Sequence, residues 1–95
     1  MKAGDFLKTA DFLVAGDRAE AYGDCVEMHQ AIADRWTVTL TQAGMKPEKS
    51  LDAHVVALLM SDMKVARILK GPYRSDSVVD ACGYLALAGE IKSRQ

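Results

Sequence analysis

The sequence has few of the features that mark thiol chemistry, secretion or membrane insertion. Its two cysteines, Cys25 and Cys82, form neither a CxxC pair nor a cluster with histidine, so they fit reduced core thiols better than a metal site. The longest uninterrupted apolar run, residues 55–60, is far too short to cross a bilayer. Charged residues interrupt the N-terminal segment 1–13, where a signal peptide would be apolar. We therefore expect a cytoplasmic protein with no membrane partner.

Basic residues are not in excess either. Lysine and arginine number 12 against 13 aspartates and glutamates, which gives a formal net charge of -1. Proteins that bind DNA or RNA neutralise the phosphate backbone with clustered lysine and arginine, so a nucleic-acid polymer is not an expected partner. The phosphate-loop and nucleophile motifs GxxxxGK[ST], GxGxxG and GxSxG are absent. His29 and His54 have no partner at metal-binding spacing and are interpreted as surface or packing residues.

Apolar residues recur instead at helical intervals. A chain of 95 residues with 49% hydrophobic content is expected to form a single globular domain, 1–95. No segment alternates with the period of a strand, and the spacing predicts four helices, at about 3–15, 24–43, 49–70 and 76–92. Gly83 in the last of them would let another helix approach closely. The predicted fold class is all-α.

The third predicted helix, 49–70, is apolar nearly all round. One stripe contains Val55, Leu59 and Met63, and another contains Leu58 and Val65. A helix of this kind belongs in the interior of something larger than a small monomer. We therefore predict a homo-oligomer with this third helix near the interface.

Charged side chains flank the break at Gly71-Pro72, which separates the third and fourth predicted helices. Lys64 and Arg67 share a face before it, and the carboxylates of Asp76 and Asp80 share a face with Tyr84 after it. Ser75 or Asp76 is expected to cap the fourth helix. A short connection makes the two helices antiparallel neighbours. The cluster is then either an interhelical ion-pair network or a site for a charged ligand.

Four segments carry a resemblance to a known family. They are GDRAEAYGD at 16–24, a helix that contains Trp36, KVAR at 64–67 and DSVVDACGY at 76–84. Together they resemble short, mostly phage-encoded domains related to the all-α, MazG-like nucleoside triphosphate pyrophosphohydrolases. The resemblance implies a four-helix MazG-like bundle.

In the MazG-like enzymes, an ExxE pair and an ExxD pair hold magnesium, which activates water and neutralises the phosphates. Asp24 and Glu27 match the spacing of the first pair, although a helix cap explains them as well. Asp80 matches the final carboxylate of the second pair, and Ser77 stands where the pattern has a glutamate. If the chain is a hydrolase, the resemblance therefore implies Glu27 and Asp80 as catalytic residues and Asp24, Glu27 and Asp80 as magnesium ligands.

Two functions follow. The first is a binding protein without a cofactor that captures a phosphorylated nucleotide and sequesters a signal of bacterial immunity in the cytoplasm of an infected host. The expected ligand-binding residues are Arg18, Lys64 and Arg67 for phosphate, Asp76 and Asp80 for hydroxyls or amines, and Tyr22, Tyr73 and Tyr84 for stacking on the base. The alternative is a magnesium-dependent nucleoside triphosphate pyrophosphohydrolase. A structural oligomer without a ligand is the third possibility.

Overall fold

The computed structural model describes residues 1–17 and 23–95. These residues form α1 (Ala3–Phe12), a π-helical turn η1 (Leu13–Asp17), α3 (Cys25–Gln42), α4 (Ala53–Lys70) and α5 (Ser75–Ser93). The described ranges contain no strand. The prediction of an all-α fold is therefore confirmed.

The start of α3 follows from its first residues. Gly23 has a positive φ of 74°, which favours glycine, and Asp24 is the N-cap. The carboxylate of Asp24 accepts hydrogen bonds from the backbone N–H groups of Val26 and Glu27, at 2.8 and 3.2 Å. Two otherwise unpaired amides of the first turn are thereby satisfied, as the sequence predicted.

Two other helix starts differ from the prediction. Helix α4 begins at Ala53, not near residue 49, because the preceding linker packs against α3. There the backbone N–H of Leu51 donates to Thr37 Oγ1 at 3.0 Å. Helix α5 begins at Ser75, and its N-cap is the extended Arg74, which makes no side-chain cap bond. The expectation that Ser75 or Asp76 caps this helix was wrong.

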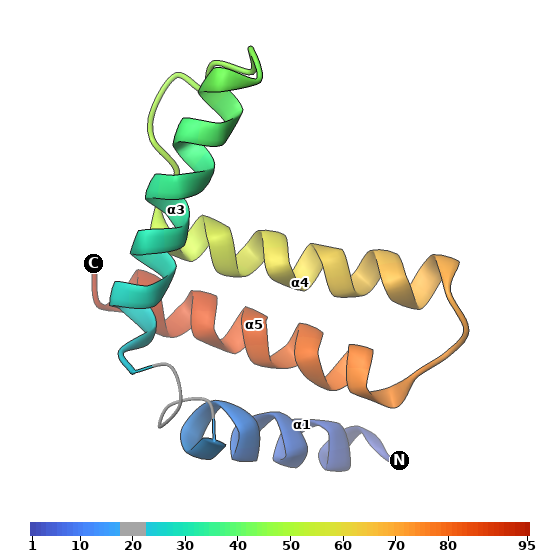
Figure 1. Cartoon of the computed structure of the whole chain (residues 1–95). Coiled ribbons are helices and arrows are strands. Elements are labelled where there is room, and N and C mark those ends of the chain that lie inside the picture. Colours follow the sequence, from blue (N-terminus) through green and yellow to red (C-terminus); the bar gives the residue numbers. More distant parts are fainter. Residues whose placement is uncertain (18–22) are drawn as a thin grey trace.

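Helices α4 and α5 form an antiparallel hairpin that carries the most extensive interhelical contact (Figure 1). Helix α1 lies along α5, and α3 crosses the end of the hairpin where α5 ends and then extends past it. Gly83 permits one close approach, since a Cβ there would lie 3.3 Å from Val14 Cγ1, as the sequence predicted. The radius of gyration, 14.3 Å, exceeds the value of about 12 Å typical of a chain this long, so the fold is open.

Small side chains dominate the buried core. Among the described residues, five of the eight buried hydrophobic residues are alanines, and the largest fully buried side chains are Val56 and Ile91. In α3, Met28 is exposed whereas His29 and Ala33 are buried. Large apolar side chains of α4 remain exposed: Leu58, Leu59, Met63, Val65 and Leu69.

Candidate functional site

Two hollows lined by described residues are candidate ligand-binding sites. The first, called here the basic hollow, has a volume of about 350 Å³ and is lined by Lys64, Arg67, Gly71, Pro72, Arg74, Asp76 and Ser77. The second, called here the large hollow, has a volume of about 740 Å³ and is lined by Asp11, Val14, Ala15, Gly23, Asp24, Cys25, Met28, His29, Ile32, Met60, Tyr84, Ala86, Leu87, Glu90 and Arg94. Residues of both α4 and α5 contribute to the lining of each hollow.

The basic hollow lies at the tip of the α4–α5 hairpin. Its lining includes the cations Lys64, Arg67 and Arg74 and the single carboxylate of Asp76. Arg74 Nε lies 3.4 Å from Asp76 Oδ1, and both of these side chains are mostly exposed. The uncapped start of α5 adds the partial positive charge of a helix N-terminus. The hollow is therefore electropositive and open to solvent.

Lys64 and Asp80 form the ion pair that joins α4 to α5. Lys64 Nζ lies 3.1 Å from Asp80 Oδ2, and each side chain is 15% exposed. The sequence left open whether this cluster is an ion-pair network or a ligand site, and these two residues do pair. Among the described residues, Arg67 has no ion-pair partner, so its charge remains available to an anion in the basic hollow.

The large hollow has a different chemistry. Its walls include Val14, Ile32, Met60 and Leu87, which come from η1, α3, α4 and α5. Its polar rim holds three carboxylates, those of Asp11, Asp24 and Glu90, and the single guanidinium of Arg94. An apolar wall with an acidic rim disfavours a free phosphate and favours a flat ligand that donates hydrogen bonds.

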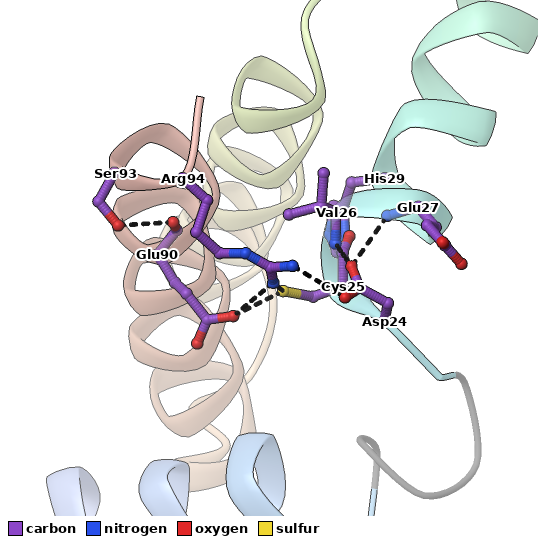
Figure 2. Close-up of polar contacts among 8 residues, drawn as sticks. All are labelled: Asp24, Cys25, Val26, Glu27, His29, Glu90, Ser93 and Arg94. Atoms are coloured by element: carbon purple, nitrogen blue, oxygen red, sulfur yellow. Dashed lines mark hydrogen bonds and ion pairs between the residues drawn. The ribbon is translucent and has the colours of Figure 1, made fainter.

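Arg94 ties the end of α5 to the start of α3, as Figure 2 shows. Its Nη2 lies 2.9 Å from Asp24 Oδ2, and its Nη1 lies 3.4 Å from Glu90 Oε2. The hydrogen bond from Arg94 holds the pKa of the Asp24 carboxyl below its usual value. Reciprocally, the bond to Asp24 raises the pKa of Arg94.

Cys25 belongs to the same cluster (Figure 2). Its Sγ donates a hydrogen bond to Glu90 Oε2 at 2.9 Å. Burial and, secondarily, this bond raise the pKa of the Cys25 thiol to about 11. Both Cys25 and Cys82 are free thiols, as expected. At neutral pH, Cys25 is therefore a hydrogen-bond donor and a poor nucleophile.

His29 is buried in the wall of the large hollow, with 7% of its surface exposed. Its Nδ1 lies 2.8 Å from the carbonyl oxygen of Cys25. Because a carbonyl can only accept, Nδ1 carries the proton, and Nε2 of the neutral ring is an acceptor. No described residue is a hydrogen-bond partner of Nε2, and the atom is reachable by solvent.

The predicted ligand-binding residues are divided between the two hollows. Lys64, Arg67 and Asp76 line the basic hollow, and Tyr84 lines the large hollow. Asp80 pairs with Lys64 between them, and Tyr73 is 68% exposed beside the basic hollow. Arg18 and Tyr22 lie outside the described residues.

In the described structure, two of the three predicted metal ligands form ion pairs, and the third lies outside the large hollow. Asp24 is paired with Arg94, Asp80 is paired with Lys64, and Glu27 is exposed and does not line the large hollow. Within residues 1–17 and 23–95, no group of three or more histidine, cysteine or carboxylate side chains is placed to hold a metal ion.

Sequence reasoning missed three residues of the large hollow: His29 as a lining group, Glu90 and Arg94. Asp24 and Arg94 are 70 positions apart, so no local spacing could indicate their pairing. The signal that existed was the carboxylate of Asp24 at the start of a predicted helix, because a capping carboxylate has a second oxygen that can accept from an arginine. None of the described helices is long and apolar enough to span a membrane.

The chain belongs to the family described as domain of unknown function DUF6378, whose model matches residues 5–92. It is 36% identical over 89 residues to the Gene 55 protein of Mycobacterium phage L5. That similarity covers 94% of this chain and 51% of the phage protein, so the chain spans about half the length of its relative. No solved structure matches the chain. These findings support the predicted likeness to phage-encoded domains.

Proposed function

We propose that this DUF6378 domain captures a phosphorylated nucleotide and holds its phosphate in the basic hollow. The observation that carries the proposal is the convergence of three cations, Lys64, Arg67 and Arg74, on one small hollow at the uncapped start of α5. Guanidinium groups present paired donors that match phosphate oxygens, and helix N-termini attract anions. Tyr73 lies next to this hollow in sequence and is exposed, so its ring is available for stacking on the ligand.

The biological role that we propose is sequestration. The phage relative supports a phage-encoded chain. The cellular target that we propose for it is a nucleotide signal of bacterial immunity. A protein that binds such a signal without cleaving it lowers the free concentration by mass action. Neither a cofactor nor a catalytic residue is needed for that role.

A magnesium-dependent, MazG-like pyrophosphohydrolase has less support. Its carboxylates would have to approach one ion, yet Asp24 is bound by Arg94 and Asp80 by Lys64. Releasing both would break two ion pairs that join helices. Incubation with a panel of nucleoside triphosphates and magnesium distinguishes the two functions: release of monophosphate and pyrophosphate would favour the enzyme, and intact ligand recovered after denaturation favours capture.

The phosphate site is tested by titration calorimetry with inorganic pyrophosphate. The double variant Arg67→Gln/Arg74→Gln removes two cations from the basic hollow, and we expect binding to weaken at least tenfold. Lys46→Gln/Lys49→Gln is the matched control, because it removes the same charge from the exposed linker before α4. Equal weakening in both variants would show that the effect depends only on net charge. If pyrophosphate does not bind the wild-type protein, the phosphate site is ruled out.

We also propose that the chain assembles as a homo-oligomer through the exposed face of α4. The accessible surface of 6603 Å² compares with about 5,400 Å² for a typical monomer of this mass. Val65 and Leu69 are one turn apart on this face, and Leu58 lies on the same stripe. A two-fold antiparallel pairing of α4 would cover this stripe with its own copy and oppose the two helix dipoles.

The oligomer is tested by analytical ultracentrifugation. We expect Val65→Glu/Leu69→Glu to shift the protein to a monomer, because each carboxylate would be buried against an apolar partner. Leu7→Glu on α1 is the control, since Leu7 is as exposed but lies on another helix. A wild-type protein that sediments as a monomer at all concentrations would contradict the proposal.

A further inference from the structure

We propose that the large hollow binds the base of the captured nucleotide and selects bases that carry an exocyclic amine. This inference rests on the proposed function and specifies its ligand. The volume of about 740 Å³ suits a ring system larger than a phosphate group. Met60 and Tyr84 form part of an apolar wall against which a flat ring can pack.

Three hydrogen-bonding groups that remain open in the large hollow are acceptors. Glu90 Oε2 is occupied by Cys25 and Arg94, whereas Glu90 Oε1 and the Asp11 carboxylate have no hydrogen-bond partner among the described residues. His29 Nε2 is a third open acceptor on a side chain that is more than nine-tenths buried. An amine supplies the donors that these acceptors require, and a carbonyl oxygen at the same place would be repelled.

The charge of Arg94 does not attract a second phosphate to the large hollow. It is shared between two carboxylates, Asp24 and Glu90, and the rim as a whole carries more negative than positive groups. The base and the phosphate of one ligand are therefore directed to different hollows.

The spacing of the two hollows is compatible with one extended ligand. Ser77 lines the basic hollow and Tyr84 lines the large hollow, and these residues are seven apart on α5, so they share a face. Seven helical residues span about 10 Å. Along α4, Met60 of the large hollow and Lys64 of the basic hollow are four residues apart, which spans about 6 Å. The ligand must therefore separate its base from its bound phosphate by about 6 to 10 Å.

The test measures binding of adenosine, inosine and inorganic pyrophosphate separately. Inosine has a carbonyl oxygen where adenosine has its amine, so we expect adenosine to bind at least tenfold more tightly. His29→Asn keeps a donor for the Cys25 carbonyl and removes the Nε2 acceptor, and it should weaken adenosine binding about fivefold to tenfold. Pyrophosphate binding should be unchanged in this variant, which also shows that the variant folds.

A blocking variant tests the location. Ala86→Trp adds bulk at the rim of the large hollow, and we expect it to abolish adenosine binding while pyrophosphate still binds. Ala31→Trp, on an exposed part of α3 outside the hollow, is the control. Adenosine that fails to bind, or that binds Ala86→Trp as well as wild type, overturns the base site while the phosphate site stands. Adenosine binding without pyrophosphate binding overturns both the phosphate site and the joint ligand.

Discussion

The two hollows of this small domain border the same pair of helices but differ in how their charges are satisfied. In the basic hollow, residues close in sequence at one hairpin supply an excess of cations, of which Lys64 pairs with Asp80 and Arg74 with Asp76, whereas Arg67 has no ion-pair partner among the described residues. In the large hollow, residues from opposite ends of the chain surround Arg94 with carboxylates. The formal net charge of the whole chain is only -1. The sign of the net charge in each hollow therefore depends on which charged side chains the fold pairs with one another.

The largest effect is expected at Cys25 in the large hollow. Because burial and Glu90 raise the pKa of this thiol from 9.0 to about 11, its thiolate is about 100-fold rarer near neutral pH than that of an ordinary cysteine. Alkylation by iodoacetamide, followed by mass spectrometry, should be slower by that factor in the folded protein than in denaturant. Glu90→Gln should accelerate it. Equal rates in the folded and denatured states would contradict the buried, hydrogen-bonded thiol.

The next largest effect that we expect is that of salt on ligand binding, which should differ between the two hollows. Raising the ionic strength from about 50 to about 500 mM shortens the Debye length to a few ångströms and screens exposed cations. We expect pyrophosphate binding in the basic hollow to weaken about tenfold, because Arg67 and Arg74 are exposed. Adenosine binding should change less than about twofold, since the ligand is uncharged. A parallel decline of both affinities, measured by calorimetry, would remove the distinction between the hollows.

A smaller effect concerns stability and pH at the rim of the large hollow. The folded-state pKa of Asp24 lies below its unfolded value, so the ionised carboxylate contributes stability above pH 3.8, and this contribution is lost as the pH falls through the folded pKa. Arg94→Gln should therefore lower the melting temperature by a few degrees at pH 7, and the difference should close as the pH falls through the lowered pKa of Asp24. Thermal unfolding followed by circular dichroism measures this. A difference that persists unchanged in acid would assign the role of Arg94 to packing.

The smallest effect is expected at Gly83, where η1 meets α5 beside the large hollow. Replacing glycine by alanine inside a helix adds about 1 kcal/mol of stability, but the new Cβ would lie 3.3 Å from Val14 Cγ1. We expect Gly83→Ala to change the free energy of unfolding by less than about 1 kcal/mol. Gly89→Ala has open space around its Cβ and should show the full gain. Urea unfolding compares the two variants, and an equal gain in both would show that Val14 yields without cost.

The Gly83→Ala variant should also affect ligand binding differently in the two hollows. Val14 lines the large hollow, so its displacement should alter adenosine binding modestly. Pyrophosphate binding at the hairpin tip should be unaffected, because no residue of η1 lines the basic hollow.

Local chemistry made much of the fold predictable. The capping of α3 by Asp24 and the break at Gly71-Pro72 follow from residues within a few positions of each other. The starts of α4 and α5 were not predictable in this way. The linker before α4 is fixed by the bond from Leu51 to Thr37, 14 positions away, and Arg74 rather than a capping side chain precedes α5.

The candidate site was predictable to the extent that its residues share a helix or a hairpin. Lys64, Arg67 and Asp76 were expected together and do line one hollow. His29 was interpreted as a surface or packing residue, because its role depends on the wall formed by η1, α3 and α5. Met28 and Met63 are partly exposed, since the open fold leaves their faces uncovered.

The sequence by itself determined the helical content, the cap of α3 and the hairpin that gathers the cations, because helical periodicity, capping and turn formation depend on neighbours along the chain. Three features depend on how the helices pack: Asp80 neutralises Lys64, Arg94 reaches Asp24, and α3 crosses the hairpin and contributes to a second, acidic hollow. These outcomes join residues up to 70 positions apart, and a pairing of that kind is set by how helices pack, which local spacing does not encode.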